Sequence, residues 1–382
     1  MIGKLLRVVV AVAVLVAAAL IGWRVLAPAE VLEPATGAAP VAAAVPPGVT
    51  GKVTMAPLIV AGSIRVYAGK RLVKADGPVQ AKTIYTALWS FRRWPEQLTG
   101  VAAVAATVVT RWSDGEVVAL DARTGKISWR ADGPGAASFT GRTGSAAVWA
   151  PPGLHTSGAS VLVTDGRQVI ARVAADGTRM WAVTLPESCG DGFVTTGGQY
   201  ACGSGAWDVR SGTAVTGWPA GPFTAVGCDV ARSGCPGLRD GAGQGWLTGG
   251  TRPERAPALD APAATAAGDL VLTASAGAVT ASRAGREVWR WAGTAQVLGV
   301  RAGRVVLLTP DRHLVVLDLT AGTPRSAFPL YVPKERVEAW KTERWQLADG
   351  YLAVERLMPE AGDDPAEPNH FYTTDPVVIA AF

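Results

Sequence analysis

The sequence predicts an all-β protein: a β-propeller of seven antiparallel blades, with eight as the alternative, preceded by a single N-terminal transmembrane helix. The 382-residue chain contains 45 Gly and 26 Pro spread along its length, which is the turn chemistry of a β-rich protein and argues against a helical bundle. Hydrophobic residues make up 49% of the chain, which excludes a disordered protein. A unit of strand, turn and strand recurs along the sequence, with a Trp at a fixed place in it.

The first segment, residues 1–27, is predicted to be a cytoplasmic tip and transmembrane signal anchor. Val8 to Trp23 contains no charged residue, and the stretch from Leu5 to Ala27 has 23 residues, enough to cross a hydrocarbon core about 30 Å thick. Positive charge before this stretch predicts a single-pass protein of the cytoplasmic membrane, with the N-terminus inside and the remainder extracytoplasmic. Cleavage after Ala27, as in a secretory signal peptide, is the alternative.

Residues 28–52 are rich in Ala, Pro and Val and show no hydrophobic period. Such a composition is typical of a spacer, so we expect an extracytoplasmic linker here. Residues 53–382 carry the repeated units and are expected to form the propeller.

Four cysteines lie within one short stretch: Cys189, Cys202, Cys228 and Cys235. An even number of cysteines in a chain with an export signal predicts disulfides, and three pairings are possible. Pairing of neighbours along the chain is the simplest of them. The spacings of 13 and 7 residues lack the tight pairs that zinc sites use.

The repeated unit is clearest around residues 104–130. Glu116–Asp121 reads as a strand, Arg123–Gly125 as a tight turn and Lys126–Arg130 as the returning strand. The glycine of this turn recurs at 52, 35, 73 and 37 residues, and the long gap predicts a degenerate copy near Gly249–Gly250. The series of turn glycines is Gly125, Gly177, Gly212, Gly285 and Gly322.

Trp stands four residues after the turn glycine in three copies, at Trp129, Trp181 and Trp289. A large flat ring at a constant position can fill the gap of about 10 Å between packed sheets. A buried indole N–H also needs an acceptor, so each ring should bond a backbone carbonyl. Units of this length with such a marker are the signature of a propeller.

The number of blades follows from counting units. Five clear copies and one degenerate copy span about residues 101–328, and residues 53–100 offer a weaker one marked by Tyr67 and Trp89. Tyr351–Leu357 and Val377–Phe382 read as two strands of a last blade. Since closure of the ring removes free edges, we expect a strand from one end of the chain to join the blade at the other.

The segment from Ala119 to Trp129 resembles the A-x-D-x-x-T-G-K-x-x-W repeat of the pyrroloquinoline-quinone-like propellers. The matching positions are Ala119, Asp121, Thr124, Gly125 and Trp129, and two further copies keep Asp and Gly at Asp208, Gly212, Asp318 and Gly322. The resemblance implies the propeller fold. The superfamily includes quinoprotein alcohol dehydrogenases and a non-enzymatic lipoprotein scaffold that helps to assemble bacterial outer-membrane barrels.

The sequence predicts no catalytic, cofactor-binding or metal-ligating residue and no cofactor. The resemblance implies that quinoprotein dehydrogenases hold their quinone beneath a disulfide of adjacent cysteines and bind Ca²⁺ through acidic and amide groups. Here no cysteines are adjacent and Asn369 is the single Asn. The histidines, His155, His313 and His370, lie in no catalytic motif.

These observations predict a membrane-tethered extracytoplasmic propeller that binds or scaffolds a protein, peptide or envelope component and is itself a monomer. Beyond the anchor, 33 basic residues face 31 acidic ones, so nucleic-acid binding has no electrostatic basis. The alternative is an enzyme on the same fold with an atypical site: a quinone-dependent dehydrogenase, a lyase or a hydrolase.

Overall fold

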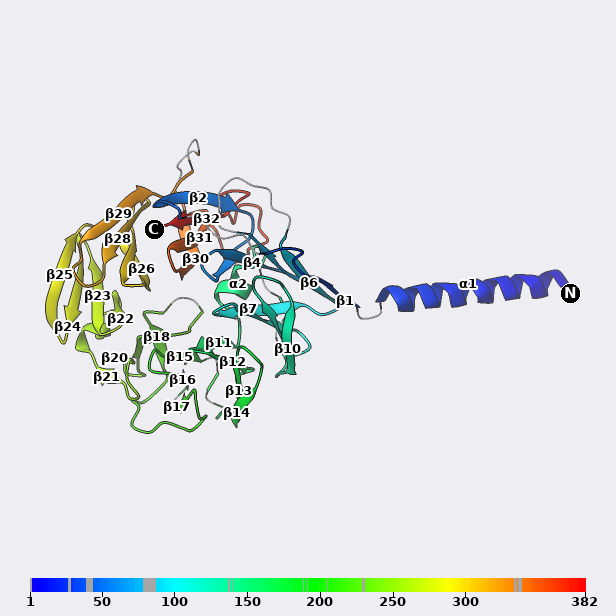
Figure 1. Cartoon of the computed structure of the whole chain (residues 1–382), viewed down its shortest axis with the longest axis horizontal. Helices are drawn as coiled ribbons and strands as arrows, with labels where there is room; N and C mark the ends of the chain where they lie inside the picture. Colours follow the sequence, from blue (N-terminus) through cyan, green and yellow to red (C-terminus); the bar gives the residue numbers. More distant parts are fainter. Residues whose placement is uncertain are drawn as a thin grey trace.

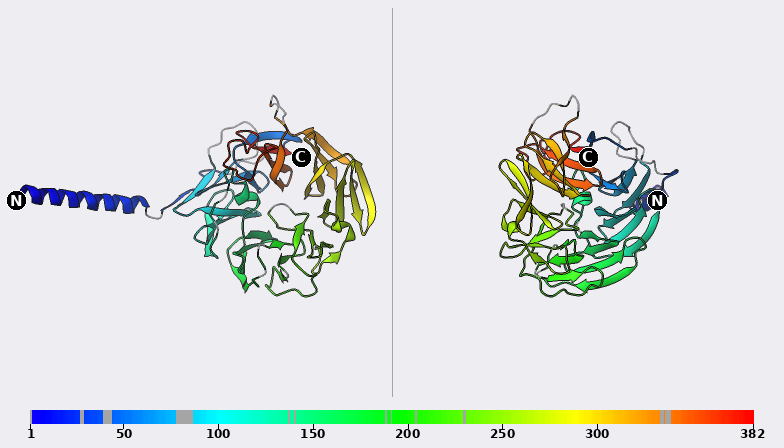
Figure 2. Two further views of the ribbon diagram at one scale, coloured as in Figure 1. Left: turned by 180° about the vertical axis from the view of Figure 1, so that it is seen from behind. Right: turned by 60° about the vertical axis from the view of Figure 1, so that its left-hand side comes forward.

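The protein is an eight-bladed ring with one helix beside it, as a computed structural model shows (Figure 1). The structure describes residues 2–26, 29–38, 44–77, 87–136, 138–139, 141–187, 189–190, 192–203, 205–228, 231–332, 335 and 339–382. Ala27, the expected cleavage point, lies outside these residues. The blades follow one another around the ring in chain order, and each is a small antiparallel sheet (Figure 2).

Helix α1 (Ile2–Leu26) projects away from the ring (Figure 1). The predicted helix is therefore present. In the part of the chain that the structure describes, we find no helix with both the length and the apolar character needed to cross a membrane.

The first three blades are regular. Blade 1 contains β3 (Pro57–Val60), β4 (Ile64–Gly69), β5 (Leu72–Asp76) and β6 (Trp89–Trp94). Blade 2 contains β7 (Leu98–Val104), β8 (Thr107–Trp112), β9 (Glu116–Asp121) and β10 (Ile127–Asp132). Blade 3 contains β11 (Leu154–Ser157), β12 (Ser160–Thr164), β13 (Gln168–Val173) and β14 (Arg179–Thr184). A short helix, α2 (Ser145–Trp149), follows blade 2 in the sequence and packs against strands of blades 1, 2 and 8.

Blades 4 and 5 have short strands. Blade 4 contains β15 (Phe193–Val194), β16 (Gln199–Cys202) and β17 (Gly205–Asp208). Where a fourth strand would follow, the structure has an isolated bridge between Trp207 and Ala214. Blade 5 contains β18 (Thr224–Val226), β19 (Gly237–Arg239), β20 (Gly245–Leu247) and β21 (Glu254–Arg255). Blade 5 is the degenerate copy expected near residues 249–250.

The last three blades are again regular, and a 3₁₀ helix, η1 (Pro257–Asp260), leads into them. Blade 6 contains β22 (Ala264–Ala267), β23 (Leu270–Ser275), β24 (Ala278–Arg283) and β25 (Arg286–Ala292). Blade 7 contains β26 (Gln296–Arg301), β27 (Arg304–Leu308), β28 (His313–Asp318) and β29 (Pro324–Pro329). Blade 8 contains β30 (Lys341–Ala348), β31 (Tyr351–Leu357), β32 (Val377–Ala381) and β2 (Gly48–Val53).

The ring closes as expected, by a strand from one end of the chain joining the blade at the other. β2 pairs with β32, with Gly48 opposite Ala381 and Val53 opposite Val377. The preferred count of seven blades is wrong, and the alternative of eight is right. The count fell short because the segment 53–100, which carries only weak markers of the repeat, contributes the four strands of blade 1, β3 to β6.

The expectation that residues 28–52 form a linker is also corrected, because this segment contributes two strands to the propeller. Besides β2, the strand β1 (Ala29–Glu33) adds a fifth strand to the outer edge of blade 1 by pairing with β6. Ion pairs fix it there: Glu30 contacts Arg130 and Arg93 of the first two blades. The composition of this stretch does not indicate strands, because β1 and β2 become strands by pairing with β6 and β32 and not through a local β pattern.

Candidate functional site in the central channel

The Trp of the repeat packs onto the next blade. In blade 2, Trp129 Nε1 donates a hydrogen bond to Ala174 O of blade 3 at 2.8 Å. Gly177 lies against the ring, since a Cβ at this position would stand 2.6 Å from Trp129 Cδ2. The φ of Gly177 is 76°, which glycine adopts without strain. One indole therefore joins two neighbouring sheets by packing and by a hydrogen bond.

The same contact, which we call the indole dock, occurs at three other interfaces. It joins blades 1 and 2, blades 3 and 4, and blades 6 and 7, with N–H to carbonyl distances of 2.7–2.8 Å. The Trp, carbonyl and Gly are Trp89, Ala122 and Gly125; Trp181, Val209 and Gly212; and Trp289, Leu319 and Gly322. Gly285 differs, because a Cβ there would meet no atom within 4 Å.

The remaining residues of the repeat shape its turn. Asp121 Oδ1 accepts hydrogen bonds from the N–H groups of Arg123 and Thr124 and from the Thr124 hydroxyl, and Ala119 is buried on the strand before it. Asp208 and Asp318 bind the amides two and three residues later in the same way. The Arg325 guanidinium and the backbone amides lower the pKa of Asp318 to about 2.

Blades 4 and 5 carry both disulfides, which follow the simplest of the three pairings. Cys189 is bonded to Cys202 and Cys228 to Cys235. The backbone of Cys235 also reaches blade 4, where its N–H donates to Val194 O at 2.8 Å. This sector is thus held by covalent and backbone links.

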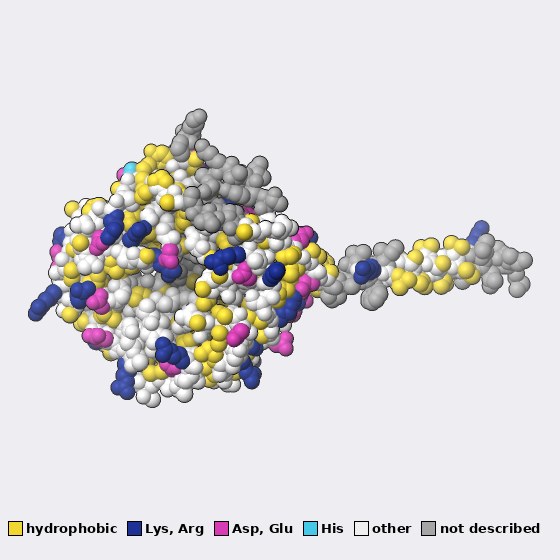
Figure 3. Space-filling view, viewed as in Figure 1, with side chains coloured by type: hydrophobic (Ala, Val, Ile, Leu, Met, Phe, Trp, Pro, Cys, Tyr) yellow, Lys and Arg dark blue, Asp and Glu magenta, His cyan; other side chains and the backbone are white. Residues whose placement is uncertain are grey.

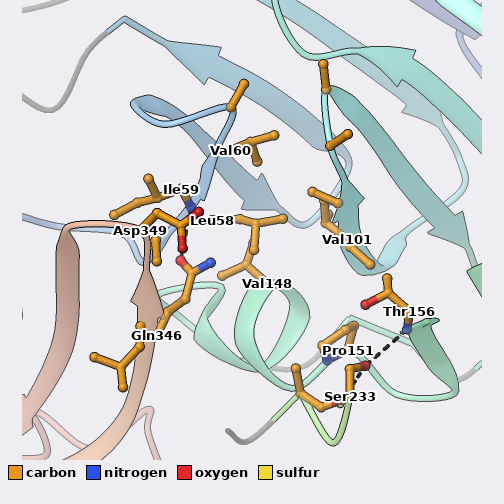
Figure 4. A pocket seen from close by; sticks show the side chains of 18 of the residues that line it. Leu58, Ile59, Val60, Val101, Val148, Pro151, Thr156, Ser233, Gln346 and Asp349 are labelled. Atoms are coloured by element: carbon orange, nitrogen blue, oxygen red, sulfur yellow. Dashed lines mark hydrogen bonds between the residues drawn. The ribbon is translucent and has the colours of Figure 1, made fainter. Parts of the chain in front are cut away.

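A cavity of about 600 Å³ opens in the channel between blades 1, 2, 3 and 8 (Figure 4). Apolar side chains line part of its wall, among them Leu58, Val60, Val101, Val148 and Pro151, but the surface that the cavity exposes is more polar than apolar. Four alanines of blade 2 also line it: Ala102, Ala103, Ala105 and Ala106. At its mouth, Arg301 pairs with Asp349 at 2.8 Å. Figure 3 shows the ring hollowed near its centre on one face.

Helix α2 forms part of the cavity wall and is held by hydrogen bonds to strands of blades 1 and 8. Trp149 Nε1 donates to Pro57 O of β3 at 2.8 Å. Glu355 of β31 is buried and accepts hydrogen bonds from the hydroxyls of Thr143 and Ser145, just before the helix and at its first residue. Burial raises the pKa of Glu355, and these hydroxyls oppose the rise. Blades 1 and 8 therefore fix α2 at the seam of the ring.

Two side chains bond the inner edges of strands that flank β7. Gln346 of β30 accepts a hydrogen bond from Ile59 N of β3 at 3.0 Å, and Ser233 accepts one from Thr156 N of β11 at 3.0 Å (Figure 4). A side-chain amide and a hydroxyl thus supply hydrogen bonds that a neighbouring strand would otherwise supply.

Sequence analysis missed the cavity, α2, Gln346 and Ser233, because none of them carries a motif. The four alanines within residues 102–106 are the one sequence signal of a wall with short side chains. The three histidines lie apart, in blades 3, 7 and 8: His155 beside Tyr200, His313 beside Asp311 and His370 against Phe371. Among the described residues, no cluster of three or more His, Cys, Asp or Glu is placed to hold a metal ion.

Comparison with known proteins supports the type of repeat. Residues 113–214 match the family model described as outer membrane protein assembly factor BamB. No curated protein sequence matches the chain. Among solved structures, BamB from Moraxella catarrhalis is similar with 14% identity and a TM-score of 0.44, covering 85% of this chain and 95% of that one.

Two other similar structures are a computationally designed protein, Ika8, and a europium-containing methanol dehydrogenase. The first has 12% identity and a TM-score of 0.48, covering 88% of this chain and 98% of the other. The second has 14% identity and a TM-score of 0.40, covering 88% and 92%. From its sheets, the chain is an eight-bladed β-propeller protein, and its residues 113–214 carry a repeat of the pyrroloquinoline-quinone-like type.

Proposed function

We propose that the protein is a scaffold module that binds a segment of a partner protein in its central channel. The observation that carries the proposal is the cavity of about 600 Å³, whose wall combines apolar side chains from several blades with polar and charged groups. Binding sites in proteins use apolar groups for contact area and polar groups for orientation. The polar groups here include Gln346, Arg123 and the Arg301–Asp349 pair. The match of residues 113–214 to the BamB family model supports a role in protein binding.

A photo-crosslinking amino acid at Ala106 tests this function in cells that make the protein naturally. Ala106 lines the cavity in the β7–β8 turn. Ala159 is a matched control in the β11–β12 turn: the carbonyls of both alanines accept a backbone N–H, from Ala122 and Ala174, but Ala159 is exposed outside the cavity lining. We expect one protein to be captured from Ala106 and not from Ala159. Equal capture at both positions, or none at either, would contradict the proposal.

We also propose that the propeller lies outside the cytoplasmic membrane and that α1 tethers it there. Two disulfides support an oxidising compartment. Residues 9–20 of α1 contain no charge, and only two residues separate the helix from β1, so a tether would hold blade 1 close to the bilayer.

Cell fractionation checks the tether. An arginine at Leu15, in the middle of α1, places a charge where insertion into hydrocarbon costs about 2.5–3.5 kcal/mol, so Leu15→Arg should move the protein out of the membrane fraction. A C-terminal alkaline phosphatase fusion, which is active only after export, should be active. An inactive fusion would contradict the extracytoplasmic placement.

A further inference from the structure

The innermost strand of each blade has one edge that its own sheet leaves unpaired. β3, β7 and β11 are the last strands in the order of their sheets, and all three line the channel cavity. Backbone groups on such an edge need hydrogen-bond partners when they are removed from water. Comparing the three strands therefore shows which groups in this channel bind the backbone N–H and C=O groups of an unpaired edge.

Two of the three edges are bonded by side chains. On β3, Ile59 N–H donates to Gln346 Oε1, and on β11, Thr156 N–H donates to Ser233 Oγ, both at 3.0 Å. Each donor is the last-but-one residue of its strand, directly before the turn of a hairpin. The equivalent residue of β7 is Ala103, opposite Val108.

The hydrogen-bond ladder of blade 2 turns Ala103 toward the channel. Asp121 N–H donates to Lys126 O, so the backbone groups of Asp121 point to β10 and away from Thr107, its neighbour on β8. Antiparallel ladders alternate, so Thr107 bonds Val104, and the next residue, Ala103, directs its N–H and C=O to the free edge. Among the described residues, these two groups of Ala103 have no hydrogen-bond partner on that edge.

The surroundings leave room for another backbone. The side chains next to Ala103 in the wall are those of Ala102, Ala105 and Ala106, and a cavity of about 600 Å³ adjoins them. Glycine and alanine surfaces allow close approach of a main chain, which longer side chains would block. Arg123 stands at the same mouth, and within the described residues its guanidinium forms no ion pair.

We propose that β7 binds an extended peptide segment of a partner by strand addition, with Ala103 exchanging backbone hydrogen bonds with the segment and Arg123 binding an acidic residue beside it. The proposal rests on the proposed function and names how the channel recognises its partner. Strand addition derives affinity from main-chain bonds and takes specificity from side-chain pockets. On β3 and β11, the side chains of Gln346 and Ser233 already occupy one edge N–H each.

The test uses the full chain in mild detergent under oxidising conditions. The probe is a labelled hexapeptide of alternating Val and Thr that ends in Asp, and fluorescence anisotropy measures its binding. Ala103→Pro removes the edge N–H, and an unpaired edge tolerates proline, so folding should be kept while binding weakens about tenfold. The same peptide with alternate amides N-methylated should lose about as much on the unaltered chain.

Two further variants separate the parts of the site. Arg123→Glu should weaken binding, and the difference from the unaltered chain should shrink at high salt. Ser275→Ala, the control, removes a side-chain hydrogen bond to Ala278 O in blade 6, outside the cavity lining, and should leave binding by β7 unchanged. Unchanged binding by Ala103→Pro, equal binding of the methylated peptide, or no binding of the probe would each overturn the proposal.

Amide hydrogen exchange provides a reading that does not depend on a variant. In the free protein the amide of Ala103 should exchange faster than that of Ala102, which points into the sheet, and the probe should slow it. Slow exchange of Ala103 in the free chain would overturn the proposal. Capture of a partner from Ala106 together with any of these failures would leave the scaffold function standing and remove only strand addition.

Discussion

Neighbouring blades are held together differently in two parts of the ring. In the docked sector, blades 1 to 3, residues 57–184, each blade places an indole on the glycine of the next. In the stapled sector, blades 4 and 5, residues 189–255, two disulfides link the chain, and Trp246 donates to Asp240 in its own blade. The strands there are only two to four residues long. Neither disulfide joins blade 4 to blade 5, so the covalent links compensate for short strands, and main-chain hydrogen bonds such as Cys235 N–H to Val194 O join the two blades.

Reduction of the disulfides should have the largest effect and should act on the stapled sector first. The bonds close loops of 13 and 7 residues, so each contributes about 2–3 kcal/mol to the free energy of unfolding. Urea unfolding with and without dithiothreitol measures the sum, and hydrogen exchange locates it. If blades 1 to 3 lose protection together with blades 4 and 5, the two sectors are one cooperative unit and the distinction fails.

Removal of one dock should destabilise the docked sector by a similar amount. Trp129 is 8% exposed, and Trp129→Ala deletes its packing and its hydrogen bond, at a cost of about 3–5 kcal/mol in the free energy of unfolding. Trp246→Ala serves as the comparison in the stapled sector and should cost less, because this ring is less buried. Equal losses in urea unfolding would show that the docks are not what stabilises the ring.

A methyl group at a docking glycine should separate docked from undocked interfaces. A Cβ at Gly125 would lie 2.4 Å from Trp89 Cγ, whereas at Gly285 it would meet nothing within 4 Å, and both glycines have positive φ. Gly285→Ala should therefore cost about 1 kcal/mol for its backbone alone, and Gly125→Ala about 3 kcal/mol because the ring must also move. Thermal unfolding of the two variants gives the difference directly.

The smallest effect should come from pH and belong to neither sector. Burial raises the folded-state pKa of Glu355, so its contribution to stability is present at low pH and is lost as the pH rises through that raised value. Glu355→Gln does not ionise. Urea unfolding at pH 5 and pH 8 should show the variant gaining on the unaltered protein at the higher pH. A difference that is independent of pH would mean that Glu355 titrates in the ring as it does in the unfolded chain.

How much the sequence predicts depends on whether a structural feature repeats. The spacing of Gly125, Gly177 and Trp129 was sufficient to predict blades, and four neighbouring cysteines were sufficient to predict the two disulfides. Gln346 and Ser233 were invisible because each makes a single contact with a strand distant in the chain, at 287 and 77 residues. The strands β1 and β2 were hidden in an Ala- and Pro-rich stretch, since their partners, β6 and β32, lie far along the chain.

Closure of the ring by β2 and β32 has a consequence for biosynthesis. Thr50 Oγ1 donates a hydrogen bond to Ile379 O across 329 residues of sequence, so the strand made near the start must wait for one made near the end. At about 5–20 residues per second, that wait lasts about 16–66 s. Throughout it, β2 lacks the partner strand with which it completes the last blade, and the emerging chain presents open sheet edges to its surroundings. The ring therefore has most need of chaperones while it is being made and much less once its last strand has been added.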